Sequence, residues 1–286
     1  MDNHYIPQRY LKGFQDNSNP NFVWAYEVQS KRIFNVNTTC IAFEKDLYSE
    51  EIERYLNESI EGPTIKVFDK LTRKEQIAKS DKILLAKYIT VIYNRVPTGK
   101  VRALSKCPKM LDDAYNKVEI YLKLLKNVNP HSKIPNSALS SLYDVKKLLE
   151  EDPRQREEFL NNVWQQIFPP EKMSKSLSAL IAMNWNFLFS DEEVFLTCDN
   201  PFFFFKEKGL GNTNSEFSFP ISKNVSLVAS WECKNDRIFR SARKNEIEQL
   251  NYRMLFNSQR HVFFSQKCDW IYDLRDNINY QLKKIC

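Results

Sequence analysis

The chain has 286 residues, of which 42% are hydrophobic and 13% aromatic, so it can bury a substantial core and is not a disordered polymer. Its net charge of +6 is modest for this length and supports anionic partners only weakly. It has no apolar N-terminal leader and no apolar run of membrane-spanning length, so we expect a soluble, cytoplasmic protein without a membrane partner.

Several common chemistries lack their sequence motifs. The five glycines form no P-loop, no dinucleotide-binding fingerprint and no nucleophile elbow. The six cysteines are scattered and make no C-x-x-C pair, and only three histidines accompany them, which leaves little room for a structural zinc site. Scattered cysteines in a large chain predict reduced thiols, as in a cytoplasm.

The N-terminal segment is unusually apolar for a chain end. Five of its residues are large and apolar or aromatic: Tyr5, Ile6, Tyr10, Leu11 and Phe14. Pro7 favours an extended Ile6, and the spacing after Gln8 is helical. We expect this segment to dock on the core. His4 and Gln8 are then either structural polar groups that hold it in place, or His4 is a general acid or base.

A hairpin and a set of helices follow. Residues 22–28 and 32–36 predict the hairpin, and residues 40–48, which include Glu44, are ambiguous between strand and irregular structure. Ser49 followed by acidic residues predicts a helix start, with helices to Ile60 and on to Leu71. A helix over 82–95 has apolar residues on most sides and is expected to be central.

The window from Lys82 to Lys109 contains seven basic residues and no acidic one. Aromatic rings are interleaved with the charges, and this combination suits a phosphate backbone with exposed bases. The predicted RNA- or DNA-binding residues are Lys82, Lys87, Tyr88, Lys100, Arg102 and Lys106. The alternative is a solvated face that the acidic residues between 150 and 158 balance.

The rest of the chain turns from helices to strands. Helices are predicted over 110–128, 140–150, 153–167 and 170–185, with a loop over 129–136. Strands are predicted over 187–189, 194–197, 202–205, 217–221, 225–231, 237–239 and 261–264, with helices over 244–258 and 270–282. This order predicts an α+β fold in which a mixed or antiparallel sheet packs with a helical block. We expect a single domain, residues 1–286, in which a block over 50–185 is inserted between sheet-forming segments 1–49 and 186–286.

Residues 194–205 hold the strongest candidate for a polar site. Two apolar runs flank Asp199, Asn200 and Pro201, which predicts a tight turn between two buried strands. A carboxylate and an amide held at the end of a core strand could perform chemistry. The same Asp-Asn-Pro sequence is also a common turn, in which the Asp side chain bonds to nearby backbone.

Several of these residues together resemble a known family. The segment has the form His4-x-x-Pro7-Gln8-x-Tyr10-Leu11, and Arg95-x-Pro97 follows the central helix. Thr197, Asp199, Asn200 and Pro201 follow a strand, and Phe219 to Ser222 and Asn251 come later. This pattern is similar to that of a mainly microbial family known as domain of unknown function 4238. Cys198 departs from the serine usual there, which puts a nucleophilic role for that position in doubt.

The resemblance covers nearly the whole chain but implies no established activity. Members of such families often lie among anti-phage or mobile-element genes, which implies a role in defence. Our first hypothesis is therefore a nuclease-like phosphodiesterase that acts on RNA or DNA.

In that hypothesis, His4 transfers a proton, Gln8 and Asn200 position the substrate, Arg95 stabilises phosphate charge and Asp199 binds water or a metal. Asp199 and Glu44 could together hold Mg²⁺. The second hypothesis is a non-catalytic sensor of nucleic acid, nucleotide or protein that works with a separate effector encoded alongside it.

Overall fold

The computed structural model describes residues 2–166, 174–192, 194–205, 209–276 and 280–286. The chain divides into two compact units, residues 1–96 with 169–286 and residues 97–168. Helices combined with mainly antiparallel sheets confirm the predicted α+β class. The described strands all lie in the first unit, and every described element from Glu50 to Ala182, within the predicted block 50–185, is helical.

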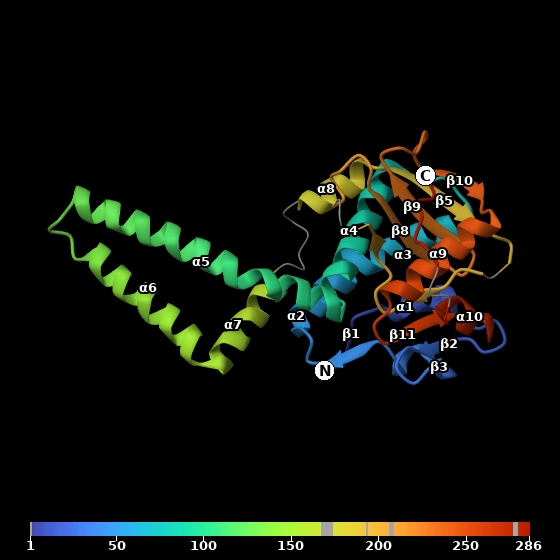
Figure 1. The fold of residues 1–286 in the computed structure, drawn as a ribbon, viewed down its shortest axis with the longest axis horizontal. Helices are drawn as coiled ribbons and strands as arrows, with labels where there is room; N and C mark the ends of the chain where they lie inside the picture. The colour runs from blue at the N-terminus through green and yellow to red at the C-terminus, as the bar shows by residue number, and fades with distance from the viewer. Residues whose placement is uncertain (1, 167–173, 193, 206–208, 277–279) are drawn as a thin grey trace. The chain divides into compact units, whose positions relative to one another are not determined.

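A four-stranded sheet joins the two ends of the chain, as predicted for the N-terminal hairpin (Figure 1). Its strands, in order, are β3 (Ile33–Asn37), β2 (Phe22–Glu27), β11 (His261–Phe264) and β6 (Thr197–Cys198). All pairs are antiparallel, and Val262 of β11 lies between Tyr26 and Cys198. The strand that ends at the Asp-Asn-Pro turn is therefore paired with a strand that lies more than 60 residues later in the chain.

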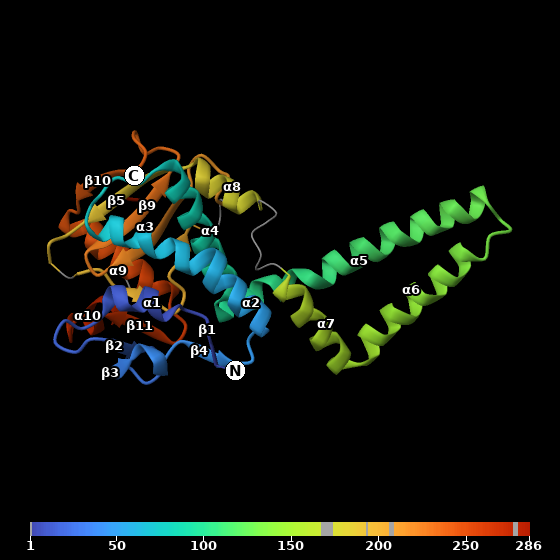
Figure 2. The ribbon, with the colours of Figure 1, turned by 180° about the vertical axis from the view of Figure 1, so that it is seen from behind.

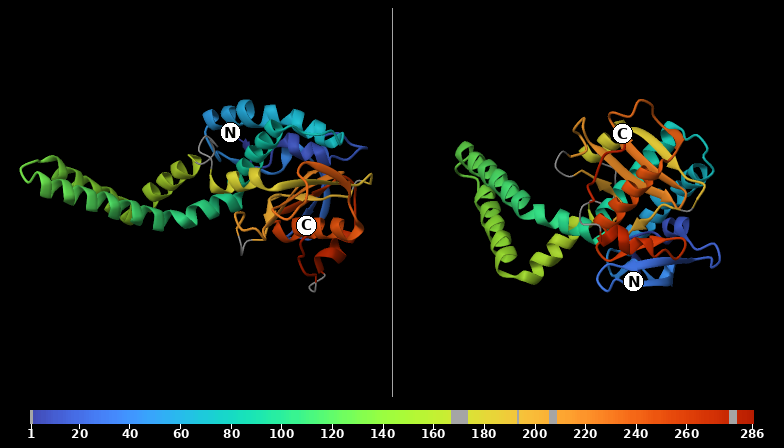
Figure 3. Two further views of the ribbon diagram at one scale, coloured as in Figure 1. Left: turned by 90° about the horizontal axis from the view of Figure 1, so that it is seen from above. Right: turned by 45° about the vertical axis from the view of Figure 1, so that its right-hand side comes forward.

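A five-stranded sheet forms the larger layer, with helices on both faces. Its order is β10 (Ile238–Ser241), β5 (Asn184–Phe189), β9 (Val225–Ser230), β8 (Glu216–Ser222) and β7 (Phe203–Phe204). Only the β10–β5 pair is parallel. Helices α3 (Gly62–Thr72) and α4 (Lys79–Arg95) cover one face, and α9 (Lys244–Asn257) packs on the other through Leu250 against Leu188 and Val228 (Figure 3). Successive residues of each strand therefore point to opposite faces of the sheet and pack into two separate cores.

The N-terminal segment docks as predicted. Strand β1 (Asp2–His4) pairs with β4 (Phe43–Lys45), and α1 (Gln8–Leu11) with η1 (Lys12–Phe14) follows. The Tyr10 hydroxyl is 2.7 Å from Thr197 Oγ1 and donates to the Pro220 carbonyl at 2.8 Å. One buried phenol thus connects the first helix to both sheets.

Four short elements also belong to the first unit. Between the hairpin and α3 lie η2 (Thr38–Cys40), α2 (Glu50–Tyr55) and η3 (Leu56–Glu61), and α8 (Lys175–Ala182) precedes β5.

Helix α4 is central, as its apolar sequence predicts. It buries Leu85, Ile89 and Ile92 completely, and it ends at Arg95 because the residue before Pro97 is driven towards an extended conformation. Among its polar residues, Lys82 is also buried. Its ammonium donates to the Met183 carbonyl at 2.7 Å and to the Asp236 carboxylate at 2.8 Å, so the charge is paired inside the core.

The second unit is a helical hairpin with a third helix. Helices α5 (Pro97–Val128) and α6 (Ile134–Glu151) run side by side, and α7 (Pro153–Gln165) follows (Figure 2). Trp164 of α7 is buried, with the Lys100 ammonium 5.1 Å from the centre of its ring. Within the described part of the chain, no helix has both the length and the apolar character needed to cross a bilayer.

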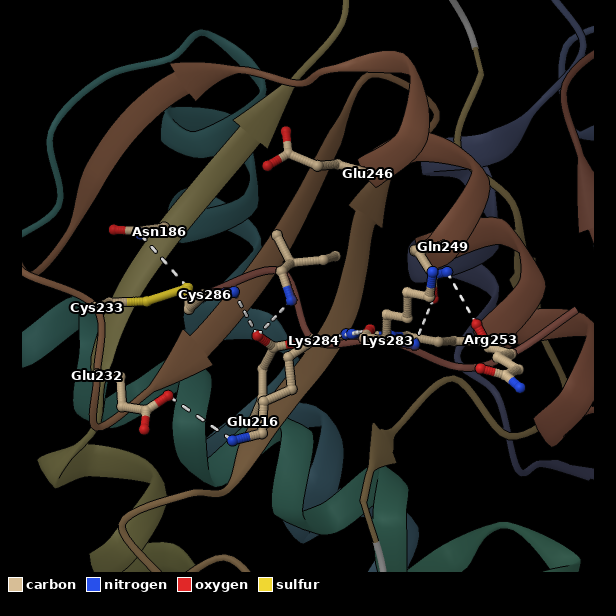
Figure 4. Close-up of polar contacts among 12 residues, drawn as sticks. Asn186, Glu216, Glu232, Cys233, Glu246, Gln249, Arg253, Lys283, Lys284 and Cys286 are labelled. Atoms are coloured by element: carbon tan, nitrogen blue, oxygen red, sulfur yellow. Dashed lines mark hydrogen bonds and ion pairs between the residues drawn. A yellow bond between two sulfur atoms is a disulfide. The ribbon is translucent and has the colours of Figure 1, made fainter.

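The C-terminal segment 280–286 lies along the larger sheet instead of continuing the predicted helix. Helix α10 (Trp270–Asp276) ends early, and residues 277–279 of the predicted helix lie outside the described residues. The backbone N–H groups of Ile285 and Cys286 donate to Glu216 Oε2 at 2.8 and 2.6 Å (Figure 4). Arg253 binds the same segment by donating to the Lys283 carbonyl, and pairs with Glu216 at 2.5 Å.

This docking corrects the prediction that the thiols are reduced. It brings Cys286 to Cys233, just after β9, and the two form a disulfide (Figure 4). Cys40, Cys198 and Cys268 are free. The pairing depends on how the last residues fold back over the sheet, which the spacing of the cysteines does not reveal.

Candidate functional site

A π-helical segment, η3, faces the N-terminal segment of the chain. Ser49 caps α2 by accepting from the Ile52 N–H, and the helix continues through η3 to Glu61. Glu53, Asn57 and Glu61 are spaced by four residues and share one face, where Asn57 donates to Glu53 at 3.2 Å. Segments of π-helix are uncommon and frequently lie at functional sites.

Arg95 connects this face to the N-terminus. It is 2% exposed, and its Nε donates to the Tyr5 carbonyl at 3.0 Å while Nη1 donates to Glu61 Oε1 at 2.6 Å. Nη2 is buried and has no hydrogen-bond partner among the described residues. Arg95 therefore holds the fold together and retains one unsatisfied donor, which is rare for a buried cation.

His4 and Gln8 lie together, as the first hypothesis requires. Gln8 Nε2 is 3.4 Å from both ring nitrogens of His4, a long contact that restrains the imidazole without fixing its tautomer. Both side chains are half-buried. Burial lowers the pKa of His4 below its usual value, although hydrogen bonding to the Thr39 backbone acts in the opposite direction. The lowered pKa favours the neutral imidazole, which is the form that can accept a proton.

A cleft of about 280 Å³ brings these groups together. Its lining residues come from the N-terminal segment, from α2 and η3, and from the end of α4: His4, Pro7, Gln8, Arg9, Lys12, Glu53, Asn57, Glu61 and Arg95. A neighbouring cavity of about 300 Å³ shares Pro7, Arg9, Lys12 and Glu61 with it. Among the described residues, Arg9 and Lys12 have no ion-pair partner, so two cations remain available for an anionic ligand.

Asp199 is placed differently from the other candidate catalytic residues. It is 2% exposed, and its two carboxylate oxygens accept from the backbone N–H groups of Gln259 at 2.9 Å and Arg260 at 2.6 Å. Burial raises the pKa of Asp199, and these backbone N–H groups act against that effect. The carboxylate thus closes the chain reversal before β11, and it is not among the residues that line the 280 Å³ cleft.

Tyr5 is the group that brings the two sequence motifs near each other. Its ring centre is 6.0 Å from the Arg260 guanidinium carbon, and burial raises its pKa, with the negative charge of Asp199 adding to the effect. The first motif and the Asp-Asn-Pro turn are therefore neighbours through Tyr5 and Arg260. Of the five predicted catalytic residues, the cleft gathers His4, Gln8 and Arg95, whereas Asp199 and Asn200 do not line it.

Asn200 fastens the same turn to the end of α9. Its Nδ2 donates to the Asn257 carbonyl at 3.3 Å, and Asn257 Nδ2 donates back to the Asn200 and Phe202 carbonyls at 2.6 and 2.9 Å. Asn200 Oδ1 is buried without a partner among the described residues. These contacts specify the conformation of the turn, so a substrate-positioning role for Asn200 remains a prediction.

The two predicted metal ligands both contact Arg260. Asp199 accepts its backbone N–H, and Glu44 accepts from its guanidinium at 2.9 Å. Carboxylate oxygens are the ligands that Mg²⁺ prefers, but here N–H donors occupy them, so an ion would have to displace those donors. The described residues contain no cluster of three or more His, Cys, Asp or Glu side chains suited to a metal.

The structure buries two residues of the predicted basic face. Lys82 and Tyr88 are 5% and 3% exposed, because α4 is central and packs both into the core. Lys87 is half-buried on the same helix. Lys100 and Arg102 belong to the second unit, where Arg102 donates to Thr98 Oγ1 at 3.3 Å; Lys106 lies in α5, but its side chain is outside the described part of the structure. The run of charge in the sequence is therefore divided between two units.

Sequence reasoning missed the partners of the first motif. Glu53 was interpreted only as an acidic residue in the first turn of a helix, and Glu61, Arg9 and Lys12 were given no role. The four-residue spacing of Glu53, Asn57 and Glu61 was a usable signal, because it places three polar groups on one face of a helix.

A wider cleft of about 890 Å³ lies elsewhere in the first unit and includes Asn251, another residue of the family pattern. Both amide atoms of Asn251 are already engaged, since Oδ1 accepts from the Leu196 N–H and Nδ2 donates to the Val194 carbonyl. Asn251 therefore supports the backbone leading into β6.

Comparisons with known proteins give a family but no activity. Neither the curated proteins nor the solved structures contain a match to the chain. A family model described as "Protein of unknown function (DUF4238)" matches residues 2–268, which includes both motifs and both sheets. The chain therefore belongs to the DUF4238 family.

Proposed function

We propose that the protein is a phosphodiesterase that acts on RNA or DNA, with its active site in the 280 Å³ cleft. The observation that carries the proposal is the grouping of His4, whose pKa is lowered by burial, with Arg9 and Lys12, two cations without an ion-pair partner among the described residues, in one cleft built by the family motif. Phosphoryl transfer needs positioning and stabilisation of negative charge more than it needs elaborate covalent chemistry.

In the proposed reaction, His4 removes the proton from an attacking hydroxyl group, either of water or of the ribose. The new P–O bond forms as the bond to the leaving oxygen breaks, and that oxygen gains a proton from solvent or from the imidazolium. Arg9 and Lys12 bind the phosphate oxygens, and Gln8 restrains the His4 ring. Arg95 is a positioning residue, because it connects Tyr5 to Glu61.

The direct test measures cleavage of labelled RNA and DNA by the full chain, with Mg²⁺, with Mn²⁺ and with a chelator. We expect cleavage that His4→Gln abolishes while nucleic-acid binding persists. Lys12→Gln should weaken binding and reduce its salt dependence. Lys234→Gln, which removes one exposed lysine from the loop after β9, is the charge-matched control and should change neither property.

A second function is favoured by a specific observation. Tyr10, Arg95, Asp199 and Asn200, all residues of the family pattern, make contacts that hold the fold together. The protein could then be a non-catalytic sensor of nucleic acid, nucleotide or protein, with a separate effector. Binding that Lys12→Gln weakens, with no cleavage under any metal condition, would favour this sensor. If neither nucleic-acid binding nor cleavage occurs, the phosphodiesterase and the nucleic-acid sensor both fail.

The proposed setting is cytoplasmic anti-phage defence, which the family resemblance supports. The Cys233–Cys286 disulfide offers a test of the compartment, because such bonds are rare where thiols are kept reduced. Rapid alkylation of intact cells, followed by mass spectrometry of the two cysteine peptides, measures the oxidised fraction. A fully oxidised pair would argue against the cytoplasm.

A further inference from the structure

Helix α5 carries an apolar stripe on the side turned away from α6. The side facing α6 is identified by Tyr115, whose ring lies 5.9 Å from the Lys146 ammonium, and by Glu119, which accepts from the Tyr143 hydroxyl. At 100° per residue, Tyr121 lies roughly 160° around the helix axis from Glu119. We call six residues the outer stripe: Met110, Ala114, Lys117, Tyr121, Leu124 and Val128.

The large side chains of the outer stripe are open to solvent. Met110 is 65% exposed, Tyr121 63%, Leu124 57% and Val128 84%. Val118, Ile120 and Leu125 flank the stripe and are also at least 40% exposed. Contiguous apolar surface of this extent on a helix marks an interaction site.

The order of residues in the outer stripe indicates what covers it. The spacing alternates between four and three residues, which is the repeat of a coiled-coil seam. The stripe is also self-complementary when two copies run antiparallel. Met110 then faces Val128, the small Ala114 faces Leu124, and the Lys117 ammonium faces the Tyr121 ring, an arrangement that allows a cation–π contact.

We propose that the outer stripe is a homodimer interface, in which two copies of α5 pair antiparallel about a two-fold axis near residue 119. Such an interface presents the same patch from both chains, as in most dimers. The exposed parts of the seven apolar side chains amount to roughly 800 Å² per chain, about what one partner contributes to a stable interface. With α6 behind each α5, the pair forms a four-helix arrangement.

The first experiment measures the mass of the purified full chain by light scattering and sedimentation over a range of concentrations. We expect twice the 33.9 kDa of one chain. Tyr121→Glu places a carboxylate in the seam and should weaken dimerisation by about tenfold or more. Asn116→Glu adds the same charge at an exposed position of α5 outside the stripe and should leave the mass unchanged. Circular dichroism confirms that both variants fold.

A second experiment tests the register through cysteine pairs. Ala114 and Leu124 lie ten residues apart, about 15 Å along one helix, which is too far for a disulfide within a chain. Chains with Ala114→Cys mixed with chains carrying Leu124→Cys should therefore form a covalent heterodimer through these positions, identified by mass spectrometry of the linked peptides. Neither variant alone should form a link through its new cysteine.

Three results would overturn the proposal. A monomer at every concentration removes the interface. Self-linking of Ala114→Cys chains shows a parallel pairing, which the antiparallel register forbids. A dimer that Tyr121→Glu leaves intact while the variant is folded places the interface elsewhere on the chain.

Discussion

Replacing Asp199 by alanine separates a structural role for the Asp-Asn-Pro turn from a catalytic one. The carboxylate accepts two backbone N–H groups, and it is 2% exposed, so water cannot readily replace it. A buried donor left without an acceptor costs about 1–3 kcal/mol. Relief from burying a charge offsets part of this loss, because burial raises the pKa of Asp199. We expect Asp199→Ala to lower the free energy of unfolding by about 3 kcal/mol.

The assay is urea unfolding of the full chain at pH 7, followed by tryptophan fluorescence. Asp199→Asn keeps one acceptor oxygen, so its loss should be about half as large. Glu248→Ala, at an exposed position of α9, is the control and should stay within about 0.5 kcal/mol of the unmodified chain. If Asp199→Ala unfolds like the control, the structural account of the turn is wrong. If cleavage is lost at the same time, Asp199 belongs to the chemistry.

Three further predictions concern single contacts. Tyr10→Phe removes the hydroxyl that connects Thr197 and Pro220 and should lower the free energy of unfolding by about 1–3 kcal/mol. A double-mutant cycle should show that adding Thr197→Val lowers it little further. Burial acts to raise the pKa of Glu246, but hydrogen bonds from Arg240 and Arg243 outweigh it and lower the pKa to about 2. The ionised Glu246 should therefore stabilise the fold above pH 4.5, and this stabilisation should be lost as the pH falls towards 2. In unfolding measurements over a pH series, Glu246→Gln should therefore reduce the loss of unfolding free energy between pH 4.5 and 2, and Glu248→Gln should not. Cys286→Ser opens the disulfide and should lower the unfolding free energy by about 2–4 kcal/mol, an effect that reducing agent reproduces and that Cys40→Ser lacks.

Much of the fold followed from local pattern. The alternation in residues 22–36 predicted β2 and β3, the apolar helix after Ser80 predicted α4, and the aromatic N-terminus predicted its own docking. His4 and Gln8 were predicted to dock with the N-terminal segment, but their contact with each other was not predicted. These features depend on residues that are close in sequence, and the periodicity of apolar residues predicts such local structure well.

Features that depend on distant segments were not accessible in the same way. Lys82 lies in a basic run, yet Asp236 and the Met183 carbonyl make its burial favourable, and neither partner is near it in sequence. The Glu216–Arg253 pair joins β8 to α9, which are far apart in sequence, and the Cys233–Cys286 disulfide depends on the path of residues 280–286 over the sheet. Asp199 was ambiguous for a related reason, because its backbone partners at 259 and 260 lie in the turn between α9 and β11, far away in sequence.

The pairing of β2 with β11 sets a delay in biosynthesis. The hairpin formed by residues 22–37 leaves the ribosome long before its neighbour, which is roughly 230 residues further on and so follows by roughly ten to fifty seconds at ordinary translation speed. During that interval the open edge of β2 has no native strand beside it, and such edges recruit other chains. Newly made chains should therefore depend on holding chaperones until synthesis reaches residue 264, and early termination should yield insoluble fragments.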